Sequence, residues 1–377
     1  MICDKQIKKN RIVLFTSNFS GGILQFTMEL YLTIPALGYE TVVFVPDNAV
    51  LNPSYMTAQG TVRTYPRQKS LKIRNETNVR IARSIEEHNP DIVLFCDTAI
   101  ISMQVSQLLK KEIYKAAFLH DVLPHPTWFQ PKKILNQFFT QMILKQTMRS
   151  LDQIIMLSKH SYNLFIQNYS RYAKKAIWMP LGAHVPRTNP VMPKELELLP
   201  INKGFYLFFG RIDKYKGIFR LLKSYNKYDS PDKPMLIIAG SGQLKRKEKM
   251  LIRSNEKIVL INRFLNDGEM IFLIENSLSV ILPYIEASQS GVLPIAYHLG
   301  TPVIVSDVEG LTEFVDHNKT GIICTNEDDF VSAMRAMQDD AFRRDLKKNI
   351  KSYYQKSFNW QTNLERLLKG MEKSMLF

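Results

Sequence analysis

The sequence is poor in cysteine and contains no long hydrophobic run. Its three cysteines, Cys3, Cys96 and Cys324, stand far apart and outside any CxxC spacing. They provide neither a disulfide framework nor a zinc site, so we expect a protein of a reducing compartment without a bound metal. No apolar stretch approaches the roughly 20 residues that cross a bilayer. The N-terminal sequence MICDKQIKKNRIVLF lacks the long apolar core of a signal peptide, and a cytoplasmic protein is predicted.

Acidic residues are also scarce. Asp and Glu together number 35 against 50 Lys and Arg, which gives a formal net charge of +15 at pH 7. This charge is compatible with a nucleic acid, an anionic membrane surface or an anionic substrate as partner. The basic residues are not accompanied by a helix-turn-helix signature, an RNA-binding aromatic motif or a zinc-finger spacing. A nucleic-acid partner is therefore not expected.

Short apolar runs alternate with helical stretches along the chain. A length of 377 residues and a hydrophobic content of 45% suffice for two domain cores. The alternation of strands and helices indicates an α/β fold with parallel sheets. The strands predicted in the front half lie at residues 11–16, 41–45, 91–95, 116–119 and 153–157.

The loop after residues 206–209 is the strongest indication of a ligand site. In the segment FFGRIDKYKG, an apolar strand is followed by Gly210, Arg211 and Lys216, and a helix is expected to begin near Gly217. Glycine permits a sharp turn, and the N-terminus of a helix favours an anion. Arginine makes bidentate contacts to phosphate, and lysine adds a point charge. We interpret this loop as a phosphate-binding site; a solvated surface turn is the alternative.

Two further strands end in conformationally permissive loops. Residues 234–242, PMLIIAGSG, and residues 278–291, LSVILPYIEASQSG, each join a buried apolar run to small residues. In an open parallel sheet the carboxyl ends of the strands lie along one edge, where doubly wound folds bind their ligands. The three loops are therefore expected to form one site.

The order of these motifs resembles the nucleotide-sugar half of bacterial glycosyltransferases of family 4. The similarity covers most of residues 204–325, through FFGRIDKYKG, LIIAGSG, PYIEASQSGVLPIAYHLGTPVIVSDVEGLTEFV and NKTGIIC. It implies the GT-B fold, an α/β architecture of two Rossmann-like doubly wound domains that face a cleft. The domains it implies are an N-terminal acceptor-side domain at 1–185, a nucleotide-sugar domain at 204–352, and a C-terminal helix at 353–377 that crosses back onto the first domain. The Pro-rich, weakly periodic stretch between the two domains predicts a linker at 186–203.

The resemblance assigns roles to the basic pair and to the serine-rich loop. Arg211 and Lys216 match the pair that neutralises the donor diphosphate and stabilises the charge of the leaving group. Backbone N–H groups and hydroxyls of residues 288–291 would bind the same diphosphate; a capped helix start without a ligand is the alternative. The implied donor-binding residues of this half are Gly210, Gly240, Gly242, Arg263, Phe264, Ser288, Gln289, Ser290, Gly291 and Glu313.

Three of these assignments carry qualifications. Arg263 and Phe264 occupy the loop that lies against the nucleotide base in relatives, where contact with the base and plain packing of Phe264 are alternatives. Glu313 matches a family glutamate near the start of the next helix, although Glu309 stands where a glycine is usual.

The chain departs from the family at two glutamates spaced eight residues apart. Aligned from Gly300, Ala287 stands at the first position, which lies near the donor sugar, and Glu286 precedes it by one residue. Ile295 stands at the second position, which holds the ribose in relatives, and isoleucine accepts no hydrogen bond. Glu286 is a candidate catalytic residue that contacts the sugar, and a surface glutamate is the alternative.

The front half contributes a histidine and a glycine turn. His120 ends the predicted strand in FLHDVLPHP, where the family often places a histidine that faces the donor sugar. Asp121 could orient the imidazole ring or cap the following turn. Gly21 and Gly22, in SNFSGG, match a loop near the donor phosphates and the acceptor, although a tight turn alone would also require glycine.

Residues 132–149, KKILNQFFTQMILKQTMR, carry an apolar helical stripe flanked by basic residues. Packing of this stripe on the first sheet is the favoured interpretation. Contact with an anionic bilayer is the alternative, and it would present a lipid-linked acceptor at the inner face of the cell membrane.

These observations predict a glycosyltransferase that moves a sugar from a nucleotide-diphosphate donor, UDP- or GDP-linked, to a hydroxyl of a glycan or lipid-linked glycan. The resemblance implies retention of anomeric configuration, a role in bacterial surface polysaccharide synthesis, and no cofactor or metal. Three alternatives stay open: a catalytically inactive scaffold or binding subunit, a nucleotide-sugar epimerase, and a nucleic-acid-binding protein.

Overall fold

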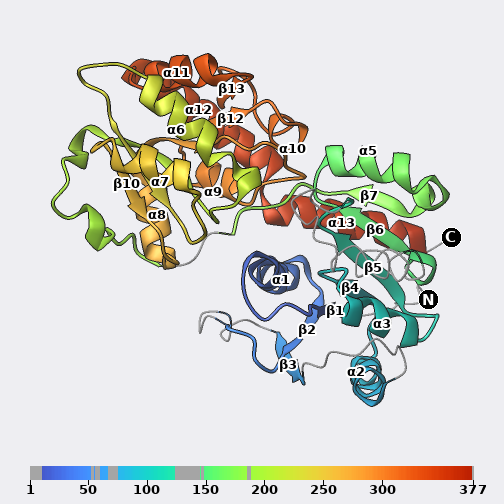
Figure 1. Ribbon diagram of the computed structural model, residues 1–377. Coiled ribbons are helices and arrows are strands. Elements are labelled where there is room, and N and C mark those ends of the chain that lie inside the picture. Colours follow the sequence, from blue (N-terminus) through green and yellow to red (C-terminus); the bar gives the residue numbers. More distant parts are fainter. Residues whose placement is uncertain are drawn as a thin grey trace. The chain divides into compact units, whose positions relative to one another are not determined.

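The computed structural model describes residues 11–51, 55, 60–66, 75–123, 145, 148–184 and 188–375. The chain forms two compact units. The first consists of Met1–Pro180 with Trp360–Phe377, and the second of Leu181–Asn359. Each unit contains one parallel sheet with helices packed around it (Figure 1).

The sheet of the first unit has the order β3-β2-β1-β4-β5-β6-β7 over the described residues. Neighbouring strands are parallel throughout. The central strands are continuous apolar runs that are buried on both faces, as parallel sheets require. The strand order reverses between β1 and β4. The strands are β1 (Arg11–Phe15), β2 (Glu40–Pro46), β3 (Thr61–Tyr65), β4 (Ile92–Phe95), β5 (Tyr114–Leu119), β6 (Gln153–Met156) and β7 (Ala176–Trp178).

The helical elements of the first unit include the last helix of the chain, α13 (Trp360–Met375). The ring of Trp360 lies 5.6 Å from that of Phe26, and Tyr39 donates a 2.7 Å hydrogen bond to Glu372. Residues 353–357, predicted to belong to this helix, instead complete the preceding helix of the second unit. The other helical elements are α1 (Gly22–Thr33), η1 (Ile34–Leu37), α2 (Glu76–Glu87), α3 (Ile100–Leu108), α5 (Lys159–Asn168) and η4 (Ser170–Lys175).

The sheet of the second unit has the order β10-β9-β8-β11-β12-β13 over the described residues. Its neighbouring strands are also parallel. The order reverses between β8 and β11, so this unit has a switch point of the Rossmann type. The strands are β8 (Phe205–Phe209), β9 (Met235–Ala239), β10 (Ile258–Ile261), β11 (Ser277–Leu282), β12 (Val303–Ser306) and β13 (Gly321–Cys324).

The stretch 186–203, predicted as a linker, belongs over its described part to the second unit. Leu196 is 1% exposed within the hydrophobic core of this unit, and Val191 donates a backbone hydrogen bond of 2.9 Å to Gly268. Buried apolar contact therefore attaches this stretch to the core of the second unit. The helical elements of the unit are η5 (Lys194–Leu196), η6 (Ile201–Lys203), η7 (Lys214–Lys216), α6 (Ile218–Lys227), α7 (Arg246–Arg253), α8 (Asp267–Glu275), α9 (Val292–His298), α10 (Glu309–Thr312), α11 (Glu327–Ala336) and α12 (Asp340–Ser357).

Candidate active site

The predicted phosphate-binding loops meet at the switch point of the second unit. Strands β8, β9 and β11 are neighbours, so the loops that follow them leave the same edge of the sheet. Arg211 and Lys216 follow β8, and residues 283–291 follow β11. The prediction that these loops lie together is confirmed.

Glycines let the backbones of two of these loops touch. Gly210 has φ 122° and Gly240 has φ 145°, both in the left-handed half of conformational space. A Cβ atom at Gly240 would lie 2.0 Å from the carbonyl oxygen of Gly210. Gly242 pairs with Ile212 in an isolated parallel bridge and exchanges two 3.1 Å hydrogen bonds with the amide of Asn262. These glycines therefore shape the edge of the site through the backbone.

Arg211 points toward solvent and forms an ion pair with Asp213, two residues further along the loop. The side chain of Arg211 is 69% exposed. An exposed pair of this kind contributes little to stability and can be exchanged for a better anion. The guanidinium is therefore accessible to a phosphate.

Lys216 occupies a different environment. Its Nζ atom lies 3.8 Å from the ring centre of Tyr284 and 5.0 Å from that of Tyr215. The pKa of Lys216 is lowered to about 8, mainly by burial and also by the charge of Arg211, while Tyr215 and Asp213 act in the opposite direction. Among the described residues, no carboxylate forms an ion pair with this ammonium. The lysine is thus a cation whose charge is not cancelled by a neighbouring acid.

The serine-rich loop lies between β11 and α9. Ser290 is buried, and its Oγ atom accepts a 3.3 Å hydrogen bond from the backbone N–H of Val292. The side-chain oxygen of Gln289 is buried and has no hydrogen-bond partner in the described part of the chain. Ser288 precedes it, and Gly291 is the N-cap residue of α9. The loop therefore offers an unsatisfied acceptor oxygen as well as backbone donors.

At the two positions where the family carries glutamates, the structure has a buried isoleucine and an alanine that packs against a helix. Ile295 is only 8% exposed and belongs to the hydrophobic core of the second unit. Ala287 lies against α10, because a Cβ atom at Gly310 would be 2.1 Å from the carbonyl oxygen of Ala287. Glu286 lies in the same loop as Gln289, between β11 and α9. The described residues thus place no carboxylate at either family position.

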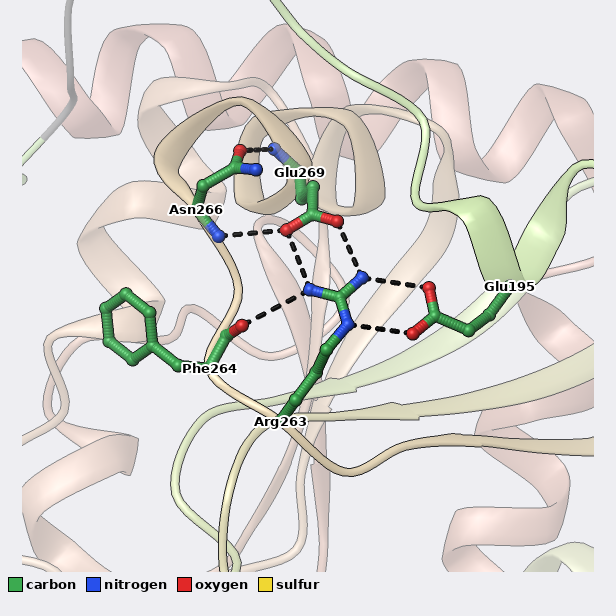
Figure 2. Close-up of polar contacts among 5 residues, drawn as sticks. All are labelled: Glu195, Arg263, Phe264, Asn266 and Glu269. Atoms are coloured by element: carbon green, nitrogen blue, oxygen red, sulfur yellow. Dashed lines mark hydrogen bonds and ion pairs between the residues drawn. The ribbon is translucent and has the colours of Figure 1, made fainter.

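Arg263, predicted to lie against the nucleotide base, is paired with two carboxylates of the second unit (Figure 2). Its guanidinium donates to both oxygens of Glu195, at 2.8 Å each, and to both oxygens of Glu269, at 2.6 and 3.0 Å. A fifth bond of 3.2 Å reaches the carbonyl oxygen of Phe264. These contacts use all five N–H groups of the side chain, so it has none left for a nucleotide.

Phe264 is exposed, as its predicted contact with the nucleotide base requires, whereas Glu313 differs from its predicted setting. The side chain of Phe264 is 82% exposed, so the alternative of plain packing is wrong and its ring is available to a ligand. Glu313 is the C-cap residue of α10 and does not lie at the helix start, because α10 spans a single turn. Its charge contributes to the raised pKa of Tyr353, after burial and Asp316.

In the first unit, His120 follows β5 and is fixed by a backbone group. Its Nε2 atom lies 2.9 Å from the carbonyl oxygen of Cys96, which can only accept, so Nε2 carries the proton. Burial lowers the pKa of the imidazole, so the ring is neutral at pH 7. Asp121, suggested as the group that orients the ring, acts on it through charge, together with Asp97. The Nδ1 atom is the acceptor nitrogen of this tautomer.

Asp97, which the sequence alone did not single out, organises the loop between β1 and α1. It is 3% exposed and accepts hydrogen bonds from the Thr16 hydroxyl at 3.0 Å, the Ser17 N–H at 2.7 Å and the Asn18 amide at 3.0 Å. Residues 16–18 therefore depend on a carboxylate that follows β4, the strand next to β1. An aspartate directly after a buried strand was the available signal.

Gly21 and Gly22 complete this loop at the start of α1. Gly21 has φ 81° and caps the helix, and no atom lies within 4 Å of a Cβ position at either glycine. Both residues are exposed. The N-terminus of α1 is therefore open on this side within the described part of the first unit.

Comparison with known proteins matches both units to glycosyltransferase families. The family described as "Glycosyltransferase Family 4" matches residues 20–184, and "Glycosyl transferases group 1" matches residues 194–353. The chain belongs to glycosyltransferase family 4. The two parallel sheets are accordingly the Rossmann-like domains of the GT-B fold.

Two relatives of this chain come from Methanocaldococcus jannaschii. The uncharacterized glycosyltransferase MJ1607 is 29% identical over 41% of this chain, and the uncharacterized glycosyltransferase MJ1069 is 23% identical over 64% of it. The matches span the same shares, 41% and 64%, of the relatives' own lengths.

Solved structures of similar fold cover nearly the whole chain. Sucrose-phosphate synthase from Thermosynechococcus elongatus has a TM-score of 0.70 at 17% identity and covers 97% of this chain and 98% of its own. HepE from Anabaena, solved in complex with UDP, has a TM-score of 0.72 at 16% identity and covers 96% of this chain and 100% of its own. These identities establish the fold alone.

Three further features of the chain concern the stripe at 132–149, membrane-spanning helices and groups that could bind a metal ion. The stripe at 132–149 lies almost entirely outside the described residues. Among the described residues, no helix has the length and apolar character needed to cross a membrane. The same part of the chain holds no group of three or more His, Cys, Asp or Glu side chains arranged to bind a metal ion.

Proposed function

We propose that this glycosyltransferase uses a nucleoside-diphosphate sugar, UDP- or GDP-linked, and transfers the sugar to a hydroxyl of a glycan or lipid-linked glycan. The observation that carries the proposal is Lys216, a cation without an acidic partner among the described residues, which follows the same strand as Arg211. A diphosphate would supply a negatively charged partner to Lys216 and would replace Asp213 as the partner of Arg211. The Anabaena relative of similar fold is solved with UDP and with UDP-glucose, which supports the same donor class.

In the proposed reaction, the bond between the anomeric carbon and the diphosphate oxygen breaks, and a bond from the acceptor oxygen to the same carbon forms. The acceptor proton passes to the departing phosphate, and the negative charge of the nucleoside diphosphate is stabilised by Arg211 and Lys216. The resemblance implies that the configuration at the anomeric carbon is retained. It also implies a role in surface polysaccharide synthesis.

The ribose of the donor requires a partner other than a family glutamate, because Ile295 is buried in the core. Gln289 is the proposed substitute, since its buried oxygen is an acceptor without a hydrogen-bond partner in the described residues. A hydroxyl of the ribose or of the sugar would satisfy it.

Isothermal titration with UDP, GDP, dTDP and ADP tests the donor site. We expect one nucleotide to bind selectively, with affinity reduced by about tenfold or more in Arg211→Ala and Lys216→Ala. The matched control is Lys214→Ala, which removes an exposed lysine from the same loop and should leave the affinity unchanged. Failure of every nucleotide to bind would reject the donor site.

Turnover separates the proposal from its main alternative, a catalytically inactive scaffold. The scaffold is favoured by one observation, the absence of a carboxylate at the positions of Ala287 and Ile295. Mass spectrometry of the selected sugar nucleotide, with and without an acceptor glycan, would show sugar transfer in the first case and intact donor in the second. NMR of the product reports whether the anomeric configuration is retained.

A further inference from the structure

Tyr284 is a buried aromatic residue beside Lys216 that neither the sequence motifs nor the family resemblance assigned to the site. It lies two residues after the end of β11 and is fully buried. Its hydroxyl lies 3.4 Å from the Oγ atom of Ser290, and its carbonyl oxygen accepts a hydrogen bond from the hydroxyl of Ser306. The residue is therefore anchored through its backbone carbonyl and through its hydroxyl, and its ring is buried.

The backbone around Lys216 is fastened to the backbone around Tyr284. A Cβ atom at Gly217 would lie 1.8 Å from the carbonyl oxygen of Pro283, so only glycine permits this approach. Gly217 also has φ 70°, in the left-handed region. On the other side, Ile285 donates a 2.8 Å backbone hydrogen bond to the carbonyl oxygen of Tyr215. The loops after β8 and β11 are thus joined on both sides of the lysine.

The 3.8 Å distance from Nζ of Lys216 to the ring centre of Tyr284 is within the range of a cation–π contact. A carboxylate in this place would cancel the charge of the lysine, whereas an aromatic ring orients the ammonium and leaves its net charge in place. The ring covers one side of the ammonium. Of the three N–H groups of the ammonium, one hydrogen-bonds to the side chain of Tyr215, and neither tyrosine supplies a carboxylate that would replace an anion.

We infer that Tyr284 is a positioning residue, which holds the Lys216 ammonium in place for the diphosphate of the donor. This inference rests on the proposed function. The tyrosine hydroxyl ties the same ring to Ser290, so one side chain connects the basic loop after β8 with the serine-rich loop after β11. Holding the lysine in advance reduces the freedom that it loses when a diphosphate binds.

Stepwise fluorination of the ring is the test, because it weakens the attraction for a cation while the shape of the side chain stays nearly constant. Tyr284→Phe first removes the hydroxyl contact with Ser290. Phenylalanine analogues with one and then three ring fluorines follow at the same position. We expect nucleotide affinity to fall with each added fluorine, reaching a total loss of roughly fivefold or more. Equal affinity across the series would overturn the inference.

A double-mutant cycle guards against a purely structural explanation. Tyr284→Leu in the natural background should weaken nucleotide binding by about five- to thirtyfold, whereas Tyr284→Leu combined with Lys216→Ala should lose no more than Lys216→Ala alone. Additive losses would mean that Tyr284 acts through general packing, and the inference would fall. Thermal unfolding of each variant shows whether it is folded. If Tyr284→Leu does not fold, the fluorine series alone decides whether the inference holds.

The same titrations separate this inference from the proposed function. If the unmodified protein binds no nucleoside diphosphate, the proposed donor site itself fails. If it binds one and Lys216→Ala weakens binding, but the fluorine series has no effect, the donor site stands and only the role of Tyr284 is rejected.

Discussion

Nε of Arg263 donates a 2.8 Å hydrogen bond to Oε1 of Glu195, a residue 68 positions earlier in the chain. A second bond of 2.8 Å joins Nη2 to the other carboxylate oxygen, so the contact is bidentate. Glu195 belongs to η5, and Arg263 follows β10. This pair therefore fastens the segment before β8 to the edge of the sheet.

Removing this arginine should destabilise the second unit without weakening nucleotide binding. Arg263→Ala leaves Glu269, whose side chain is 9% exposed, without its cationic partner. We expect the free energy of unfolding to fall by about 1–3 kcal/mol. The loss is modest because Arg263 and Glu195 are more than a third exposed, so solvent screens their interaction. Urea unfolding measures the loss, and Arg253→Ala, an exposed arginine of α7, is the control. A large loss of nucleotide affinity in Arg263→Ala would contradict the structural role.

The contribution of the Arg263 cluster to stability should depend on pH. Hydrogen bonds from Arg263 lower the pKa of both Glu269 and Glu195. A carboxyl group with a lower pKa in the folded state contributes stability that is present above its unfolded pKa and lost as pH falls through its folded pKa. The stability difference between the natural protein and Arg263→Ala should thus be full above about pH 5 and shrink toward about pH 3. Unfolding at a series of pH values measures it, and a constant difference would refute the prediction.

Nucleotide affinity should fall as pH rises through the pKa of Lys216. Burial lowers this pKa to about 8, so the free protein loses the lysine charge above that value, and a diphosphate binds the charged form. We expect affinity to decline by up to about tenfold per pH unit above this point. Titration between about pH 6.5 and about pH 9 tests it. Lys216→Arg should stay charged and lose this decline, since arginine has a much higher pKa.

Asp97→Asn should loosen the loop between β1 and α1. Hydrogen-bond donors contact both oxygens of the buried Asp97 carboxylate. In asparagine an NH2 group replaces one of these oxygens, and because it is itself a donor it would face a donor of the protein. We expect a loss of about 1–3 kcal/mol in unfolding free energy and faster hydrogen exchange of the Ser17 N–H. Asp47→Asn, at an exposed position of the same unit, is the control. Unchanged exchange at Ser17 would show that the carboxylate does not hold the loop.

His120→Ala should reduce turnover more than nucleotide binding. The neutral ring donates through Nε2 to Cys96 and retains an acceptor nitrogen at Nδ1. Because the family resemblance assigns this histidine to the donor sugar, we expect kcat to fall by roughly tenfold or more while the affinity for the free nucleoside diphosphate changes little. Because burial lowers the pKa of the ring, activity should show no His120 titration above about pH 6.5. Equal losses in turnover and nucleotide affinity would argue for a structural role.

Most strands could be predicted because their residues form apolar runs. The five strands expected in the front half correspond to β1, β2, β4, β5 and β6, with ends that differ by at most two residues. Strand β3 was missed because it lies at the sheet edge, where Arg63 and Thr64 are exposed and the apolar signal disappears. Strand β7, at the other edge, has only three residues.

The loops of the site were predictable, but the contacts made by their side chains were not. Gly210, Arg211 and Lys216 stand directly after a buried strand, so their place at the sheet edge follows from the order of elements. The pairing of Arg263 with Glu195 could not be predicted, because it depends on how the segment before β8 returns to the sheet. The same motif position that suggested a ligand contact holds a structural ion pair.

The sequence by itself determined two α/β units and the strands from which the site residues emerge, because hydrophobic periodicity and glycine positions are local properties of the chain. Only the tertiary structure decided which side chains are free to bind a ligand. It places the ammonium of Lys216 against the ring of Tyr284 and pairs Arg263 with the carboxylates of Glu195 and Glu269. Distance and burial set these partnerships, and both depend on segments that are far apart in the sequence and meet only in the folded protein.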